Sequence, residues 1–497
     1  MNAICRAGVM LFLLPLAASA QEAKTAPIDA ATVEAYEKLG ASHYGLGLGR
    51  GHLRMVSWSV NCEIGPEGLP GFSFLFRNLP EKMPAVSVPF GLDLSDSRVT
   101  DDELVVLAGM KNLRAISLWK TQVTDAGLKH LANLTDLTWL DLSESAVKGP
   151  GLKSLANLKK LTTLYLDRQQ LTDLNLQILR EAGLLHAVAH EDARYWTLNM
   201  LAANAEKAPP RPRSKEEVVA LNFRDSHITD VGLAELAGFS NLTRLDLSHT
   251  RVSDAGMKEI TRFKKLRKLL LQGTAVTDRA VKDLAEMKEL VVLDLAGTPI
   301  SDRALKELAG LTKLAALHLD CTQISDVALR SLREAGLLPA LVYSTQYQSV
   351  PARPRSADEI TSFDLSGTRV TDAGLAELAI FKNLAVLNLA GSQVTDAGLR
   401  GLAPFKNLTT LHVSGDQLTD TSMRELREIG LLHALAGAKT GKITDFTRPR
   451  PRSLDEVDEL DLTSANITAA ALKEVARMKN LRSLTLTDNR LGDGALK

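Results

Sequence analysis

Two histidines, His186 and His190, stand four residues apart. On a helix this spacing places both rings on one face, where they could ligate a metal ion. No HExxH motif accompanies them, and two internal copies of the segment carry Pro339 and His433 in place of His186. We therefore interpret His186 as a structural residue, and we predict neither a metal site nor a cofactor.

Cys62 and Cys321 are the cysteines that remain once Cys5, which lies in a leader segment, is set aside. A nucleophilic cysteine needs an activating partner, and the sequence shows none near either residue. About nine repeat units separate them, which at ~4.8 Å per strand is far beyond the ~7 Å Cα limit of a disulfide. We expect two free thiols. The chain also has no P-loop, GxSxG or strand-linked GxGxxG motif, so the sequence predicts no enzyme.

An Asp follows Thr or Ser at regular intervals along the chain, as at Asp101, Asp125, Asp173, Asp230, Asp254 and Asp278. A row of carboxylates could suggest calcium, but calcium repeats place Asp in tight turns, whereas these residues open helices. Thr or Ser at an N-cap followed by a first-turn carboxylate explains the pattern. Three Asn-Leu-Thr sequences, at 133, 241 and 407, match a glycosylation acceptor, but each lies at a turn of the repeat, and we interpret them as repeat chemistry.

The Thr/Ser-Asp step marks an internal repeat of 24 residues, as at 229, 253, 277, 301 and 325. The full unit reads LxxLxLxxTxVTDxGLxxLxxLxx, as in Leu242 to Leu266. The alternation within LxxLxL predicts a short strand, and the apolar spacing of three that follows predicts one stripe of a helix. A single unit cannot bury its leucines, but a stack of units makes a continuous core.

This pattern resembles leucine-rich repeats over roughly residues 90 to 497. Its TDxGLxxL half resembles the class found beside F-box motifs in ubiquitin-ligase receptors, and the chain resembles exported bacterial repeat proteins more closely still. The resemblance implies an α/β solenoid, a curved right-handed coil with parallel strands on the concave face and helices on the convex face, and a binding role. The chain departs from the family by placing Thr after the strand, where Asn or Cys is usual, and by lacking an F-box-like segment.

Three junctions divide the array. Near copies of LREAGLL at 179–185, 332–338 and 426–432 are each followed by an irregular stretch and by RPRS at 211–214, 353–356 and 450–453. We interpret the junctions as modified coils that continue the solenoid and bend it. The predicted organisation is a cap region at 21–88 and repeat blocks at 89–213, 214–355, 356–452 and 453–497, the last incomplete. In the cap, Asp29 should begin a short helix reaching Leu39, with strand-like runs at Leu53–Val60 and Gly71–Phe76.

The first twenty residues have the form of a signal peptide, with Arg6, an apolar run and Ala18-Ser19-Ala20 before the predicted cleavage. No other stretch approaches the ~18 apolar residues of a membrane span. Lys+Arg and Asp+Glu both number 59, so no basic excess points to nucleic acid. We therefore predict a secreted or periplasmic protein that neither spans a membrane nor binds nucleic acid.

The outward side chains of the strands should form the binding surface. They lean acidic, and three successive strands carry Trp119, Trp139 and Tyr165 near Asp141 and Asp167. Because Trp and Tyr dominate binding hot spots, we predict that these five residues bind a protein or peptide partner, and the acidic lean favours a basic one. Two alternatives stay open: a structural envelope protein that self-associates through an uncapped C-terminal end, and a substrate-receptor subunit of a ligase-like complex.

Overall fold

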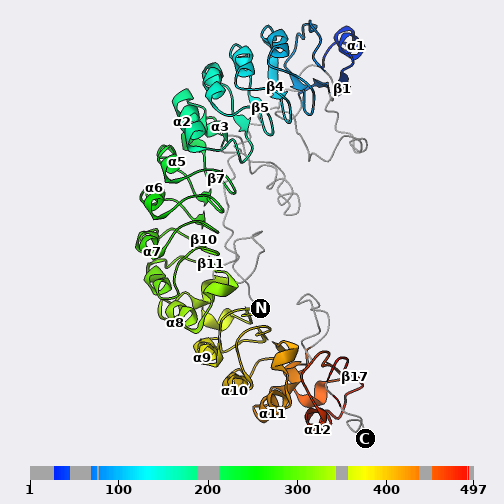
Figure 1. Ribbon diagram of the computed structural model, residues 1–497, viewed down its shortest axis with the longest axis vertical. Helices are drawn as coiled ribbons and strands as arrows, with labels where there is room; N and C mark the ends of the chain where they lie inside the picture. Colours follow the sequence, from blue (N-terminus) through cyan, green and yellow to red (C-terminus); the bar gives the residue numbers. More distant parts are fainter. Residues whose placement is uncertain are drawn as a thin grey trace, which may run out of the picture.

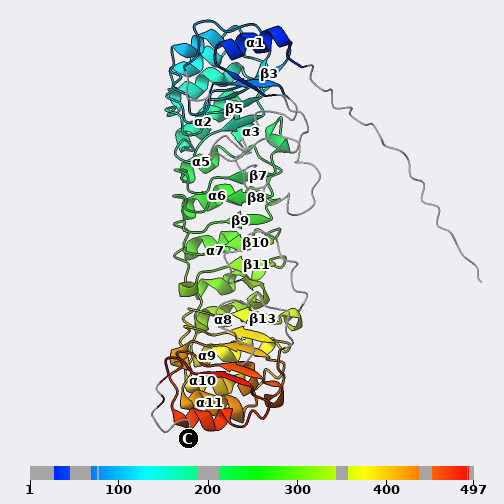
Figure 2. The same ribbon diagram turned by 90° about the vertical axis from the view of Figure 1, so that its right-hand side faces the viewer.

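The computed structural model describes residues 27–44, 69–74, 78–188, 212–342, 356–435, 450–489 and 491. These residues form an arc in which short strands line the inner side and helices line the outer side (Figure 1). Viewed from the side, the strands stack one above another like rungs, one for each coil (Figure 2). The predicted leucine-rich-repeat solenoid is confirmed.

The inner strands form four sheets. The first sheet runs in order from β1 to β6, the second from β7 to β12, the third from β13 to β15, and the fourth pairs β16 with β17. All strand pairs are parallel except β1 with β2. The strand bounds are β1 Ser42–Tyr44, β2 Gly71–Ser73, β3 Phe90–Asp93, β4 Leu113–Ser117, β5 Trp139–Asp141, β6 Thr163–Tyr165, β7 Ala220–Asn222, β8 Arg244–Asp246, β9 Lys268–Leu270, β10 Val292–Asp294, β11 Ala316–His318, β12 Leu341–Val342, β13 Ser362–Asp364, β14 Val386–Asn388, β15 Thr410–His412, β16 Glu459–Asp461 and β17 Ser483–Thr485.

The outer elements are short, and many are 3₁₀ helices rather than the α-helices that the apolar spacing suggested. The α-helices are α1 Ala30–Lys38, α2 Asp173–Ala182, α3 Leu185–Val188, α5 Asp230–Ala234, α6 Met257–Ile260, α7 Asp278–Ala285, α8 Asp326–Glu334, α9 Asp372–Leu375, α10 Asp396–Leu399, α11 Asp420–Glu428 and α12 Ala469–Val475. Elsewhere 3₁₀ turns take the place, as in η1 Glu103–Leu107, η2 Gly127–Leu131, η3 Pro150–Asn157, η6 Ala304–Gly310 and η13 Leu432–Leu435.

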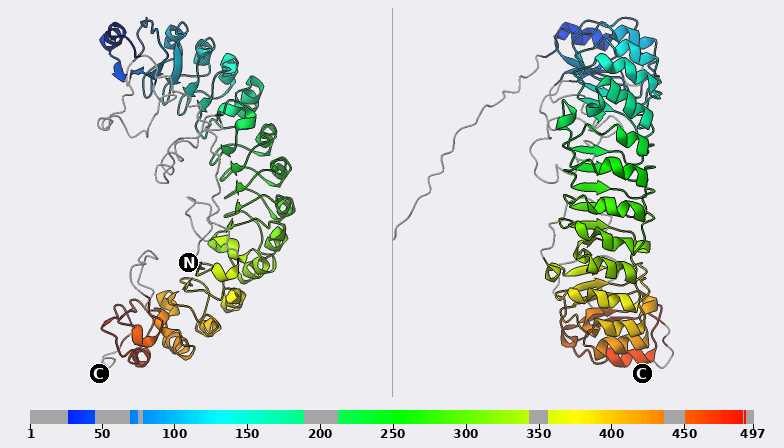
Figure 3. Two further views of the ribbon diagram at one scale, coloured as in Figure 1. Left: turned by 180° about the vertical axis from the view of Figure 1, so that it is seen from behind. Right: turned by 90° about the vertical axis from the view of Figure 1, so that its left-hand side faces the viewer.

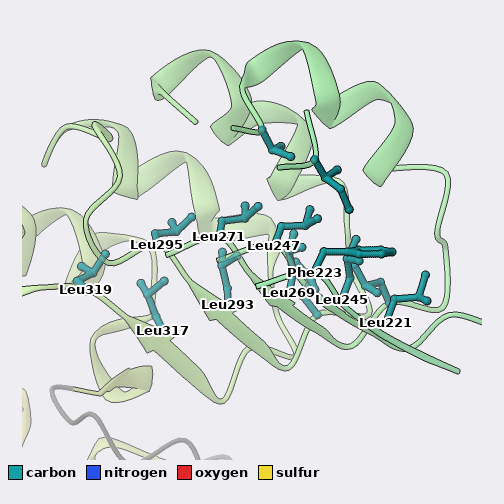
Figure 4. Packing of buried hydrophobic residues seen from close by; sticks show 14 of the residues in the cluster. Leu221, Phe223, Leu245, Leu247, Leu269, Leu271, Leu293, Leu295, Leu317 and Leu319 are labelled. Carbon is teal, nitrogen blue, oxygen red and sulfur yellow. The ribbon is translucent and has the colours of Figure 1, made fainter. Parts of the chain in front are cut away.

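The core is a set of leucine rows that run along the arc between strands and helices. Leu245 and Leu247 stack on Leu269 and Leu271 of the next coil, and all four side chains are at most 1% exposed (Figure 4). Each row continues through the neighbouring coils, so that a coil inside the stack buries its leucines against the coils on both sides, whereas Leu484 of the last described strand is 36% exposed. This stacking is the physical reason why the unit must repeat.

The N-terminal end of the stack is covered by a small cap. Helix α1 begins at its N-cap Asp29, whose carboxylate accepts from the Thr32 amide at 2.9 Å, as predicted. Tyr36 stacks on Phe72 with ring centroids 3.8 Å apart, and its hydroxyl donates to the Pro84 carbonyl. The predicted run at Leu53–Val60 lies outside the described residues.

The Thr/Ser-Asp step joins one coil to the next, a role that the sequence did not reveal. The Asp230 carboxylate accepts from both the backbone amide (2.8 Å) and the hydroxyl (2.6 Å) of Ser253 in the following coil. The same pair of bonds recurs from Thr124 to Asp101, Thr277 to Asp254, Ser301 to Asp278 and Thr395 to Asp372. Each Asp therefore stabilises the stacking of two coils in addition to opening its own helix, and we call this row the Asp ladder.

The Asp ladder passes directly across all three junctions. Thr229 bonds to Asp173, Thr371 to Asp326 and Thr468 to Asp420, with amide-to-carboxylate distances of 2.8–2.9 Å. The coil before each junction and the coil after it are thus neighbours in one stack, and the arc seen from behind is continuous (Figure 3). The three junctions interrupt the sheets but not the Asp ladder.

Candidate binding surface

Eight of the described strands end in an Asp or Asn whose side chain closes the turn that follows. Asp246 accepts from the Ser248 amide at 2.9 Å, and the same bond is made by Asp93, Asp141, Asn222, Asp294, Asp364, Asn388 and Asp461. Such bonds from a side chain to the amide two residues on are Asx turns. The carboxylates from which an acidic inner face was predicted therefore serve largely to hold these turns. The sequence did hold a signal of this turn-closing role: positions 222 and 388 carry Asn, which supplies the same hydrogen-bond acceptor without the charge.

Strands β5 and β6 bring Trp139 and Tyr165 together, as predicted. Their rings meet edge to face with centroids 5.5 Å apart, and they form a small apolar cluster with Leu69 and Ala115, separate from the leucine core. The prediction of accessible side chains is wrong for this pair, because Trp139 is 2% exposed and Tyr165 is 7% exposed. The period-2 pattern assigns a side chain to a face of the sheet, but it carries no information about what covers that face.

The indole N–H of Trp139 is buried, and it has no hydrogen-bond partner within the part of the chain that the structure describes. Leaving such a donor unsatisfied costs about 1–3 kcal/mol, so each instance in a folded protein needs a reason. A backbone carbonyl of a bound chain would satisfy it. This polar atom is the one feature of the cluster that packing alone does not explain.

The two predicted acidic residues are engaged by backbone amides. Asp141 is fully buried and accepts from Ser143. Asp167 accepts from the amides of Gln169, Gln170 and Glu144 at 2.7–3.1 Å. Their carboxylates hold the turns after β5 and β6, so a partner would meet little of their hydrogen-bonding capacity.

Trp119 is the partly exposed aromatic residue of the predicted set. It lies two residues beyond β4, on the coil before Trp139, and the Lys120 ammonium sits 5.5 Å from the centroid of its ring. Lys120 has a left-handed backbone (φ 55°) and also pairs with Asp96 at 3.1 Å. The turn thus presents an indole ring beside a paired cation on the rim of the inner face.

The sequence also raised two histidines and two cysteines as candidates for metal binding or catalysis. Burial lowers the pKa of His186, against a smaller opposite effect of hydrogen bonds to the Leu161 and Gly183 backbone, and His433 in the third junction has matching surroundings. His190 and Cys62 lie outside the described residues, and Cys321 is a free thiol. Within the described ranges, no group of three or more His, Cys, Asp or Glu side chains could hold a metal ion.

Two of the three glycosylation-like asparagines serve the repeat itself. The Asn241 side-chain amide donates to the Glu216 carbonyl at 2.7 Å, and that of Asn407 donates to the Lys382 carbonyl at 3.2 Å. Both bonds connect the helix-to-strand turn of one coil to that of the coil before. A search of the described residues also finds no helix long and apolar enough to cross a membrane.

The comparisons with known proteins agree with the fold. The family model described as Leucine Rich repeat matches residues 240–260, 360–379 and 382–403. No curated protein matches the chain. Similar solved structures include an internalin (inlF) from Listeria monocytogenes str. 4b F2365, at 17% identity over 80% of this chain and 85% of that chain, with a TM-score of 0.31.

Two further structures are similar to this chain. The plant peptide hormone receptor RGFR1, solved in complex with RGF2, is 13% identical over 84% of this chain and 73% of its own, with a TM-score of 0.38. The internalin C2 (inlC2) of the same Listeria strain is 24% identical over 51% of this chain and 80% of its own, with a TM-score of 0.24. The F-box-associated subclass finds no support in these comparisons. The matched repeats, together with the stacked parallel strands and buried leucine rows, give the chain a leucine-rich-repeat fold.

Proposed function

We propose that this chain is an exported, non-enzymatic scaffold that binds a protein or peptide partner on the inner face of its first repeat block. Leucine-rich-repeat proteins in general bind proteins, and the curvature of the solenoid offers a partner an extended inner surface. The export half of the proposal is supported by the signal-peptide pattern of residues 1–20.

The location rests on two observations in adjacent coils: the indole N–H of Trp139 has no hydrogen-bond partner among the described residues, and the ring of Trp119 is partly exposed. Residues 115 and 139 pair in register between β4 and β5, so the two tryptophans belong to adjacent coils. In this proposal Trp119 contacts the partner, and the buried N–H of Trp139 donates to one of the partner's backbone carbonyls once the cluster opens to admit it. Tyr165, Asp141 and Asp167 keep Trp139 and its turn in position.

Two variants test the site without removing a whole side chain from the packed cluster. Trp119→Ala deletes the exposed ring, and Trp139→Phe keeps a buried aromatic ring but removes the N–H donor. Val231→Ala on the outer side, where the valine is 68% exposed, is the matched control. The full chain and each variant would be used to capture proteins from envelope extract, followed by measurement of the affinity for whatever the full chain retains.

We expect Trp119→Ala and Trp139→Phe each to weaken binding about 10-fold or more, the loss of roughly 1.4 kcal/mol or more. The control should bind like the parent. Equal affinity in all variants would refute the site. Oligomers in light scattering of the purified chain, with no partner retained, would instead favour the structural, self-associating alternative.

A further inference from the structure

The turn between α6 and β9 carries the densest group of positive charges in the chain. Residues 262–268 read Arg-Phe-Lys-Lys-Leu-Arg-Lys, so five of the seven are basic, and no other stretch of seven residues holds as many. Phe263 and Leu266 are 4% and 1% exposed, and they anchor the turn in the leucine core. Because those two side chains point inward, the two lysines between them and the following Arg267 are exposed.

Lys264, Lys265 and Arg267, which we call the basic turn, are not compensated by acidic side chains of their own. Lys264 and Arg267 make no ion pair or side-chain hydrogen bond with any described residue, and Lys265 donates to the neutral Asn241 side chain at 2.7 Å. Like charges this close in the chain repel one another. Packing of the coil therefore gives no reason for the group, and a ligand of opposite charge does.

The first repeat block shows the same turn with its charges paired. The equivalent residues are Arg114, Asp136 and Lys160 in the first block and Arg267, Glu289 and Lys313 in the second. In the first block the Asp136 carboxylate pairs with both Arg114, at 3.2 Å, and Lys160, at 2.6 Å. In the second block Glu289 pairs with Lys313 at 2.6 Å, and with no other described residue. Arg267 therefore remains available to a ligand.

A hollow of about 230 Å³ lies beside the basic turn, between it and the turn that precedes β10. Lys264 and Lys288 line it, together with apolar side chains such as Met287. Glu286 and Glu289 line it as well, but each of these carboxylates already has a lysine within 4.0 Å. An anionic group at this hollow would meet cations from two adjacent coils.

We propose that the basic turn binds a linear phosphate polymer. A phosphate offers oxygens in several directions, so one group can accept from Lys264 and from the Arg267 guanidinium together. Binding of several phosphates releases their counterions, which makes the affinity high at low salt. The site is separate from the inner-face site around Trp119, so each can be present without the other.

Two other anionic partners fit this turn less well. Sites for single-stranded nucleic acid combine cations with aromatic rings on which the bases stack, and the one aromatic residue of the turn, Phe263, is buried. An anionic membrane is flat and would cover several coils. The equivalent turn of the preceding coil carries Ser240 and Asn241 and no cation, so the positive group is too narrow for a membrane.

Binding of inorganic polyphosphate to the full chain, measured by titration calorimetry at low ionic strength, tests the proposal. The test variant is Lys264→Gln/Lys265→Gln/Arg267→Gln. The control variant is Lys382→Gln/Lys406→Gln/Lys479→Gln, which removes the same charge from the equivalent turns of other coils. All six side chains are exposed, so we expect both variants to fold.

We expect the test variant to bind at least about 10-fold more weakly than the parent, and the control variant to stay within about 2-fold. At ~0.7 per phosphate contact, as for a single strand, the test variant should also lose about 2 from the slope of log affinity against log salt. Glu289→Gln should tighten binding about 2-fold or more, because it removes a negative charge and releases Lys313. Trp119→Ala should bind polyphosphate like the parent.

A parent chain that does not bind polyphosphate would overturn the proposal. Equal losses in the two triple variants would also overturn it, because overall charge would then explain the affinity. Tighter binding to a single-stranded oligonucleotide with the same number of phosphates, or to phosphatidylglycerol vesicles, would assign the turn to nucleic acid or to a membrane instead. Competition by inorganic phosphate at equal phosphate concentration would reduce it to a site for a single anion and count against the polymer.

Discussion

Replacing Asp326 by Ala removes the rung of the Asp ladder that crosses the middle junction. Its carboxylate accepts from the Thr371 amide at 2.8 Å and from the Thr371 hydroxyl at 2.5 Å. Hydrogen bonds to a charged group contribute ≈1.5–3 kcal/mol each, and this pair is partly exposed. We therefore discount each of the two bonds to about 1–2 kcal/mol for solvent screening, and we expect a loss of about 2–4 kcal/mol in the local stability of the junction.

Asp326→Asn should cost less, about 1 kcal/mol. The amide oxygen can still accept from the Thr371 N–H, and the side-chain NH₂ can donate to the Thr371 hydroxyl oxygen. Asp283→Ala is the control, because Asp283 is exposed on α7 and its side chain makes no hydrogen bond or ion pair with any described residue. A surface substitution of that kind stays within about 0.5 kcal/mol.

Hydrogen–deuterium exchange read by mass spectrometry suits this test, because long repeat arrays do not unfold in one step. The Arg369 amide, which donates to the Ile324 carbonyl at 3.0 Å across the same junction, is the reporter. Since 1.4 kcal/mol corresponds to a factor of ten, Asp326→Ala should speed its exchange roughly 25- to 700-fold. Exchange no faster than in Asp283→Ala would refute the reasoning that the ladder holds the coils together.

Three further predictions follow from the packing. Burial keeps His186 and His433 neutral by lowering the pKa of each, so their contribution to stability is complete above the unfolded value of ~6.5 and is lost as the pH falls through the lower folded pKa. Lowering the pH from 7 to 5 should therefore loosen the first and third junctions, as read by hydrogen exchange. The middle junction, which carries Pro339 at the equivalent position, should not loosen. Trp139→Ala should destabilise the chain by about 3–5 kcal/mol in denaturant unfolding, whereas Trp119→Ala should cost less than about 1 kcal/mol; similar costs would mean that the two rings are equally buried. Gly374→Val should destabilise its coil in thermal unfolding, because a Cβ there would lie 2.3 Å from Asp326 Oδ1, whereas Gly109→Val, with open space around it, should not.

Periodicity determined the solenoid because each leucine of the unit must meet its copy one coil away, and a strict 24-residue spacing allows only a stack. The cap helix at Asp29 followed from local capping chemistry, which needs only neighbouring residues. The same local chemistry identified the Thr/Ser-Asp step as the start of a helix, but it did not show that the Asp also bonds to the next coil. The partner of each Asp lies mostly 23 residues on in the chain, as from Asp230 to Ser253, and only stacking brings the two together.

The binding surface shows the same division. Alternation along β5 and β6 correctly placed Trp139 and Tyr165 side by side on the inner face, because strand register follows from the repeat. Their burial, and the use of Asp141 and Asp167 as turn acceptors, depend on contacts between segments that no pattern within one unit encodes. Sequence spacing therefore determined which side chains share a face, and the tertiary structure decided which of them are covered and which carboxylates are already bonded, because both depend on what packs across coils.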